Sequence, residues 1–226
     1  SLEVVQRIGY DSFCPDNGVL LALNTDGEGR NGGPNEFNCF NWVIDAHPED
    51  INIVDYVKPN GQKVMRTVAD YRQLNDALFH AGLNSGSEFE YIDTQNRLHF
   101  YVIDIHRNGQ EVLSYTVGVR SLDSDIVRKA ATISAQKTPL KISGEGIAEF
   151  IVSGDDICRV KADVEGEGWE VKLYNEIVAP GEGRDVRVPV YVRSLPGCSK
   201  KGEITLTAVS ESNNSIKSYA VRKVKL

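Results

Sequence analysis

The stretch RDVRVPVYV at residues 184–192 decides the fold class of the C-terminal half. Valine occupies every second position from 186 to 192, and mostly polar residues occupy the positions between them. This period of two is typical of a strand that buries one face. EITLTAV at residues 203–209 alternates in the same way. Pro189 cannot donate a backbone hydrogen bond, so the pattern places it most easily on an edge strand.

Working outward, the last hundred residues contain seven such runs separated by Gly, Pro, Asn and Asp. The runs are residues 129–135, 147–153, 157–164, 169–174, 184–192, 203–209 and 216–226. Seven short alternating strands in a segment of this length are typical of an immunoglobulin-like sandwich. The sequence therefore predicts an all-β protein whose residues 125–226 form a seven-stranded immunoglobulin-like β-sandwich.

The first half is also rich in strand signals. Short apolar runs occur at residues 18–24 and 41–47, and residues 97–105 and 110–120 flank an Asn-Gly pair that favours a hairpin. Residues 67–82 differ, because apolar residues recur there at helical spacing between Thr67, a helix cap, and Gly82, a helix terminator. We expect residues 1–124 to form a β-sandwich or jelly-roll-like domain with one short helix.

The distribution of charge supports this division into two domains. Of the net charge of −7, residues 1–124 contribute −9 from 18 acidic and 9 basic residues, and residues 125–226 contribute +2. An acidic chain is a poor general partner for nucleic acid. The longest apolar run, residues 18–23, is too short for a membrane span, and the N-terminal ten residues have no export-signal pattern. The lack of an initial Met fits a processed or excised piece.

Cysteine usage indicates the compartment. Four cysteines allow three pairings, of which Cys14–Cys39 with Cys158–Cys198 keeps each bridge within one half of the chain. Such bridges would place the protein in a secreted or extracytoplasmic location. The alternative is four free thiols in a cytosolic protein. A zinc site is disfavoured because no Cys-x-x-Cys pair occurs.

Catalytic motifs are absent from the sequence. It contains neither His-Glu-x-x-His nor Gly-x-Ser-x-Gly, so we predict no catalytic residues. GEGRNG at residues 27–32 matches a dinucleotide-binding pattern, but Pro34 and nearby acidic residues oppose a phosphate site. The same loop offers Asn24, Asp26 and Glu28 as alternate oxygen ligands, which gives a hypothesis of a structural calcium ion.

Aromatic residues in the C-terminal half suggest a second kind of site. Trp169 and Tyr191, with Tyr174, could form a platform that binds carbohydrate. The alternative interpretation, which we favour for Trp169, is packing between the two sheets of a sandwich.

Specific strings resemble known proteins. The strings GYD, DNGVLLA, FNWVIDAHPED, DYRQLNDALF and LHFYVID begin at residues 9, 16, 40, 70 and 98. Together they resemble the segment after the catalytic unit in secreted zinc metallopeptidases of the immune inhibitor A (thuricin) type. The tail contains GWEVKL, VAPGE, VPVYV and GEITLTAVSE, beginning at residues 168, 178, 188 and 202. It resembles the immunoglobulin-like module associated with bacterial glycosidases.

The resemblance implies a C-terminal region of a bacterial secreted metallopeptidase, with the zinc ligands and general base in an upstream catalytic domain. We therefore expect a non-catalytic accessory region that supports the protease fold, presents substrate or attaches the enzyme to a surface. Its expected partner is the upstream catalytic domain of the same polypeptide. The alternative is a module that binds carbohydrate or another cell-surface ligand. Calcium is the one cofactor hypothesised for this chain, and neither nucleic acid nor a membrane span is expected.

Overall fold

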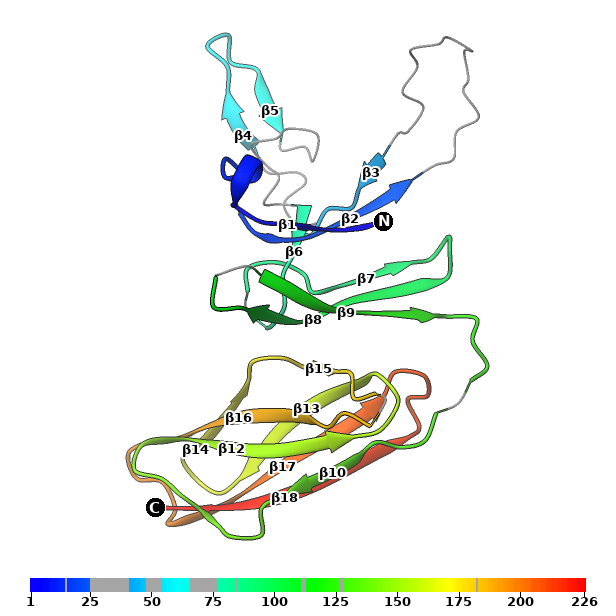
Figure 1. The fold of residues 1–226 in the computed structure, drawn as a ribbon. Coiled ribbons are helices and arrows are strands. Elements are labelled where there is room, and N and C mark those ends of the chain that lie inside the picture. The colour runs from blue at the N-terminus through cyan, green and yellow to red at the C-terminus, as the bar shows by residue number, and fades with distance from the viewer. Residues whose placement is uncertain are drawn as a thin grey trace. The chain divides into compact units, whose positions relative to one another are not determined.

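The computed structural model describes residues 1–14, 16–24, 41–47, 54–65, 77–83, 85–110, 113–126, 128–181 and 183–226. These residues form β-strands and include the short 3-10 turn Gly9–Asp11, and they contain no α-helix (Figure 1). The chain divides into two compact units. Unit 1 comprises Ser1–Tyr91 and Asp104–Thr116, and unit 2 comprises Ile92–Ile103 and Val117–Leu226. The predicted β class is confirmed.

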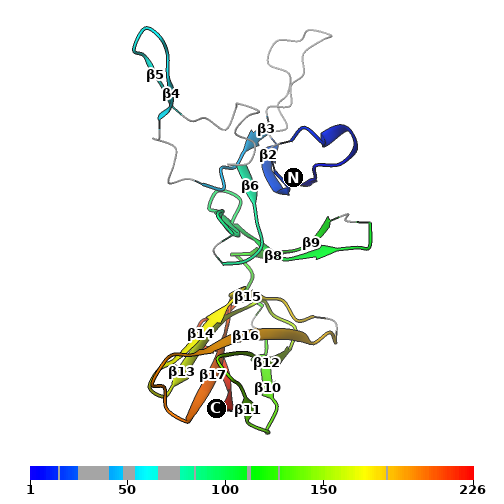
Figure 2. The same cartoon turned by 90° about the vertical axis from the view of Figure 1, so that its left-hand side faces the viewer.

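Most of unit 2 consists of nine strands in two sheets, seen from two sides in Figures 1 and 2. In order across the first sheet, the strands are β10 (Thr132–Ala135), β12 (Glu145–Ser153), β16 (Val186–Ser194) and β14 (Trp169–Leu173). In the second sheet they are β11 (Leu140–Lys141), β18 (Lys217–Lys225), β17 (Lys201–Ser210), β13 (Cys158–Glu165) and β15 (Ile177–Val178). All neighbours are antiparallel except β11 and β18.

The alternation in the sequence explains the core of these sheets. Phe150 and Val190 in the first sheet, and Ile204 and Leu206 in the second, are fully buried, whereas their neighbours along each strand are more exposed. Burial of alternate side chains on both sheets creates one apolar core, which is the main stabilising contribution. Each of the seven predicted runs contains a strand, and the two-residue strands β11 and β15 bring the number to nine.

Pro189 shows how a proline fits into this sheet. Strand β16 lies between β12 and β14, so it is not the edge strand predicted for a proline. However, β14 ends at Leu173, opposite Val190, and Pro189 is therefore paired with Glu149 of β12 alone. Pro189 lacks a backbone N–H at a position where β16 is no longer paired with β14. No hydrogen bond between these two strands is therefore lost.

Unit 1 contains a four-stranded sheet and a separate hairpin. The sheet consists of β1 (Leu2–Val5), β2 (Gly18–Asn24), β3 (Asn41–Val43) and β6 (Leu78–Phe79), and the hairpin of β4 (Val54–Val57) and β5 (Lys63–Met65). Gly18 is required by packing, because a Cβ there would lie 2.7 Å from Leu78 Cβ. The described part of unit 1 does not define the predicted sandwich or jelly roll.

The predicted helix over residues 67–82 is wrong at its C-terminal end. Leu78 and Phe79 form β6 and pair with Leu20 and Val19 of β2. Both side chains are buried by this pairing, which outweighs the local helical spacing. Residues 66–76, which carry the rest of that prediction, lie outside the described residues.

A further sheet contains β7 (Glu90–Asp93), β8 (Leu98–Arg107) and β9 (Leu113–Ser121) in that order. The predicted turn at Asn108 follows β8, and the Asn108 side chain accepts a hydrogen bond from the Gln110 N–H at 2.9 Å. Both long strands are divided between the units: residues 98–103 of β8 and 117–121 of β9 belong to unit 2.

Candidate functional site

Trp169 and Tyr191 line the same groove in unit 2, with a volume of about 800 Å³. The groove follows β14, the edge strand of the first sheet, and its neighbour β16. Besides these two aromatic residues, it is lined by Glu145, Gly146, Val164, Glu170, Val171, Lys172, Val192 and Arg193. The volume lies within the range of small-ligand sites. Both predicted aromatic residues line the groove, but strand register places them on opposite faces of the sheet, because Tyr191 is paired with Lys172, three residues from Trp169. Tyr174 is not among the lining residues.

The two aromatic residues differ in what they offer a ligand. Trp169 is 5% exposed, and its indole N–H donates to the backbone oxygen and the hydroxyl of Ser199, both at 3.1 Å. Trp169 is therefore a core residue whose polar atom is already used, in line with the alternative interpretation of its sequence. Tyr191 is 46% exposed and is the accessible aromatic side chain of the groove.

Strand register shows that five of the lining residues belong to one sheet face. Glu145, Arg193 and Glu170 lie opposite one another across β12, β16 and β14. The next row on the same face, two residues along each strand, contains Ile147, Tyr191 and Lys172. Arg193 Nε lies 3.8 Å from Glu145 Oε1, and both side chains are mostly exposed. We call these six residues the Tyr191 face.

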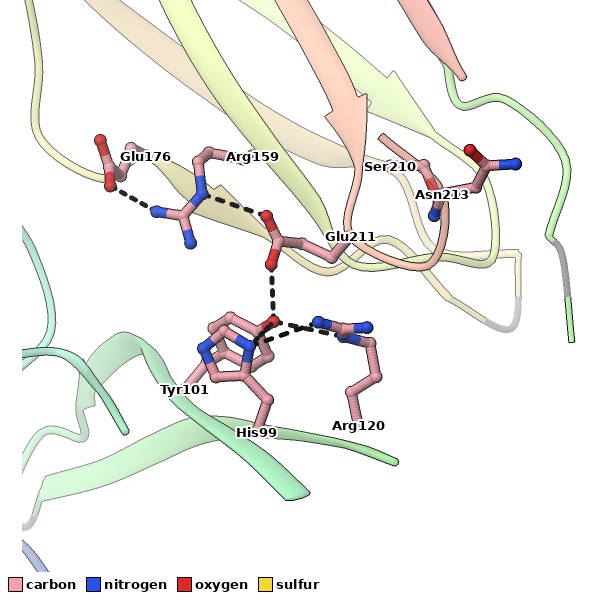
Figure 3. Close-up of polar contacts among 8 residues, drawn as sticks. All are labelled: His99, Tyr101, Arg120, Arg159, Glu176, Ser210, Glu211 and Asn213. Carbon is pink, nitrogen blue, oxygen red and sulfur yellow. Dashed lines mark hydrogen bonds and ion pairs between the residues drawn. The ribbon is translucent and has the colours of Figure 1, made fainter. Parts of the chain in front are cut away.

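A second polar group in unit 2 is centred on a largely buried carboxylate, and Figure 3 shows Tyr101 and Arg159 reaching the Glu211 side chain from two sides. We call it the Glu211 cluster; its members are His99, Tyr101, Arg120, Arg159, Glu176 and Glu211. Glu211 follows β17, and its side chain is 11% exposed. Its two oxygens accept from different partners: Tyr101 Oη at 2.7 Å and Arg159 Nε at 3.1 Å.

Tyr101 and His99 occupy the same face of β8 and are almost fully buried. Their ring centroids are 4.0 Å apart, and Tyr101 Oη lies 2.7 Å from His99 Nδ1. The one hydroxyl hydrogen goes to Glu211, and Arg120 Nη2 also lies 3.4 Å from His99 Nδ1, so this ring nitrogen contacts both the phenol and the guanidinium. Arg120 Nε donates to the Tyr101 oxygen at 3.4 Å. The phenol is therefore held by three neighbours.

Burial raises the pKa of the Tyr101 phenol, and the hydrogen bond to Glu211 raises it further, while Arg120 opposes both effects. The hydroxyl therefore remains a donor across the neutral range. On the other side of Glu211, Arg159 also donates from Nη1 to Glu176 Oε1 at 2.5 Å. These hydrogen bonds and ion pairs join side chains from different elements. The Glu211 cluster therefore holds β8, β9, β13 and the loop after β17 together within unit 2.

A smaller group lies at the start of β13. Asp156 is 5% exposed, and its Oδ2 accepts hydrogen bonds from the hydroxyls of Ser210 and, at 2.6 Å, Ser212. Asn213 N–H donates to Ser210 Oγ at 3.1 Å. These contacts fix the turn between β17 and β18, because they satisfy polar groups that burial would otherwise leave unpaired.

The predicted bridge between Cys158 and Cys198 is wrong, because both are free thiols in the structure. Cys158 begins β13, whereas Cys198 lies against Gly168, beyond the other end of that strand. An eight-residue strand spans about 25 Å, far more than the ~7 Å limit between bridged Cα atoms. Burial, and then nearby Asp156, raise the pKa of the Cys158 thiol to about 12. Cys14 is also a free thiol in the structure, so its predicted bridge to Cys39, which lies outside the described residues, is wrong as well.

The calcium hypothesis stays a prediction. Asp26 and Glu28 lie outside the described residues, and the side chain of Asn24, the last residue of β2, is not described either. Across the residues that are described, no group of three or more His, Cys, Asp or Glu is arranged to hold a metal ion.

The described part of the chain also contains no helix that is long and apolar enough to cross a membrane.

Sequence reasoning missed the Glu211 cluster. Within β8, His99 and Tyr101 are polar interruptions of an otherwise apolar run, and this was a usable signal. Glu211 and Arg159 carried none, because Glu211 is separated by 110 residues from Tyr101 and by 52 from Arg159.

The chain is therefore a β-rich protein whose C-terminal core consists of two sheets. Residues 1–122 match a family model described as a middle domain, and residues 143–226 match one described as a Peptidase M6-like domain. The first match covers more than half of the sequence, so the chain belongs to this middle-domain family.

One relative is the protein named "Putative secreted metallopeptidase" from Arthroderma benhamiae, which is 36% identical over 95% of this chain. The chain spans only 34% of that relative's length. The match confirms the predicted relation to a secreted metallopeptidase and agrees with the predicted secreted location. The expectation of a bacterial origin is not supported, because this relative is fungal.

Two solved structures show a weaker likeness. A FixG-related protein from Vibrio parahaemolyticus matches with a TM-score of 0.34 and 15% identity, over 43% of this chain and 96% of its own. The secreted serine protease VesC from Vibrio cholerae matches with a TM-score of 0.30 and 11% identity, over 42% of this chain and 23% of its own. Both TM-scores are below 0.5, so neither likeness defines the fold.

Proposed function

We propose that this chain is a non-catalytic accessory region of a secreted metallopeptidase and that it supports the fold of the peptidase. The observation that carries the proposal is its relation to the Arthroderma benhamiae protein, of which it spans about a third. A middle domain and a Peptidase M6-like domain follow each other in this third. The remaining length of that relative is ample for a catalytic domain, in which we place the zinc site.

The Glu211 cluster supports a structural role. Tyr101 lies in the middle-domain match and Glu211 in the Peptidase M6-like match, and both belong to unit 2. Their 2.7 Å hydrogen bond, with the Arg159 ion pair behind it, connects the two matched segments within one compact unit. A region held in this way can serve as a rigid support for a catalytic domain, which is its proposed partner.

The proposal includes the predicted division at residues 124 and 125, between an acidic N-terminal domain and an immunoglobulin-like C-terminal one. Limited proteolysis tests it. We expect the first cut near residues 122–126. Cleavage confined to residues 24–35 would contradict the division, because it would leave residues 36–226 as one resistant unit.

Casein hydrolysis tests the non-catalytic role. The purified chain should release no peptides, with or without added zinc. Hydrolysis that a chelator blocks would overturn the proposal. In the fungal relative, removing the matched segment should make casein hydrolysis more heat-sensitive while the reaction at low temperature continues. A folded but inactive deletion variant would instead show that the segment carries catalytic residues.

A further inference from the structure

We propose that the Tyr191 face is a binding site for an uncharged oligosaccharide or polysaccharide chain. The Glu211 cluster and the Asp156 group are internally paired, whereas this face presents an aromatic ring and charged side chains to the outside. The proposal is separate from the accessory role, since none of the six residues of the Tyr191 face belongs to the Glu211 cluster.

The aromatic ring supplies the first recognition element. Tyr191 lies on β16 between Ile147 of β12 and Lys172 of β14, and both Tyr191 and Ile147 are nearly half exposed. The C–H face of a pyranose ring is apolar and flat, so it stacks on an exposed aromatic ring with little loss of conformational entropy. Trp169 lines the same groove from the core, where its packing supports the position of β14.

The adjacent row supplies the second element. Glu145, Arg193 and Glu170 lie side by side across three strands, one row along from Tyr191. Carboxylate and guanidinium groups are planar and form two hydrogen bonds at once, which matches the vicinal hydroxyl groups of a sugar. A row of such groups next to a stacking ring is therefore complementary to a sugar, which is apolar on its faces and polar around its rim.

The balance of charge selects an uncharged ligand. Glu145 and Glu170 oppose Lys172 and Arg193, so the charged residues of the face sum to zero. An acidic ligand such as a phosphate would meet two carboxylates, and a basic peptide would meet two cations. A neutral glycan fits these conditions best.

Affinity electrophoresis of the purified chain tests this site. Gels contain hydroxyethylcellulose, laminarin or galactomannan as neutral probes and polygalacturonate as an acidic one. At least one neutral probe should retard the chain. Tyr191→Ala should weaken that retardation about tenfold or more, which corresponds to about 1.4 kcal/mol, and Tyr191→Phe should keep most of it. Tyr219→Ala is the matched control, because Tyr219 is a 72% exposed tyrosine on β18 of the other sheet.

Three results would overturn the proposal. The first is the absence of retardation by every neutral probe. The second is an equal loss of affinity in Tyr191→Ala and Tyr219→Ala, which would indicate non-specific adsorption. The third is binding of unfolded casein, lost in Tyr191→Ala, which would make this face a peptide-binding surface. Circular dichroism of each variant ensures that a lost affinity is not a lost fold.

Discussion

The Glu211 cluster and the Tyr191 face both combine tyrosine, arginine and glutamate, but they differ in burial and pairing. Glu211 is 11% exposed and accepts two close hydrogen bonds, from Tyr101 and Arg159. On the Tyr191 face, Arg193 and Glu145 are mostly exposed and 3.8 Å apart. Water screens the exposed ion pair between Arg193 and Glu145, so this pair contributes little to stability. The largely buried Glu211 carboxylate instead depends on its two hydrogen-bond donors, because burial removes water as an alternative partner. The same residue types therefore stabilise the fold in one place and remain available to a ligand in the other.

The largest expected effect is that of Glu211→Ala. This change removes the acceptor shared by Tyr101 and Arg159, although Arg159 keeps its ion pair with Glu176, and we expect the free energy of unfolding to fall by about 2 kcal/mol. Urea denaturation at pH 7 measures it. Glu170→Ala, from the Tyr191 face, is the matched control and should change the value by less than about 0.5 kcal/mol. Equal values for the two variants would remove the distinction between the two groups.

Tyr101→Phe should have a smaller effect. It removes one hydroxyl but leaves the ion pair between Arg159 and Glu211, so we expect a loss of about 1.5 kcal/mol in the free energy of unfolding. The same denaturation experiment measures it, with Tyr219→Phe as the exposed control. A neutral outcome for Tyr101→Phe would mean that the hydroxyl is not a stabilising donor.

Alkaline pH should weaken the Glu211 cluster through the same phenol. Because the pKa of Tyr101 is higher in the folded chain than in the unfolded one, its contribution is full below about pH 10 and declines as the pH rises toward the folded value. At pH 10.5 the expected loss is about 0.8 kcal/mol, since the unfolded chain releases the proton and the folded chain does not.

Urea denaturation at pH 8 and pH 10.5 measures this loss. The raised pKa of Cys158 contributes a loss of the same sign, so the comparison is made between the parent chain and Tyr101→Phe. The variant should lose less stability over this interval. An equal loss in both chains would show that Tyr101 is not the group responsible.

The smallest effect is expected for Tyr191→Ala. Its side chain is nearly half exposed and has no buried partner to abandon, so the free energy of unfolding should change by less than about 0.5 kcal/mol. Thermal denaturation followed by circular dichroism checks this. A large destabilisation would mean that Tyr191 is a structural residue, and the contrast with Tyr101 would then disappear.

Local patterns predicted much of the fold but little of its polar chemistry. The valines of β16 alternate because one face of the strand is buried, and this property is visible in the sequence itself. The helix predicted over residues 67–82 was wrong at Leu78 and Phe79, because these residues gain more from pairing with β2 than from the local helical spacing. The expected bridge between Cys158 and Cys198 followed from counting cysteines, which contains no information about the length of β13.

The sequence by itself determined that the chain is built of strands, that strong alternation fills its C-terminal half, and that it resembles part of a secreted metallopeptidase. It also selected Trp169 and Tyr191 and favoured a core position for Trp169. Tertiary structure alone decided that Tyr101, Glu211 and Arg159 meet. The physical reason is that side-chain alternation is set by the pleat of one strand, whereas pairing of charges depends on which distant strands become neighbours.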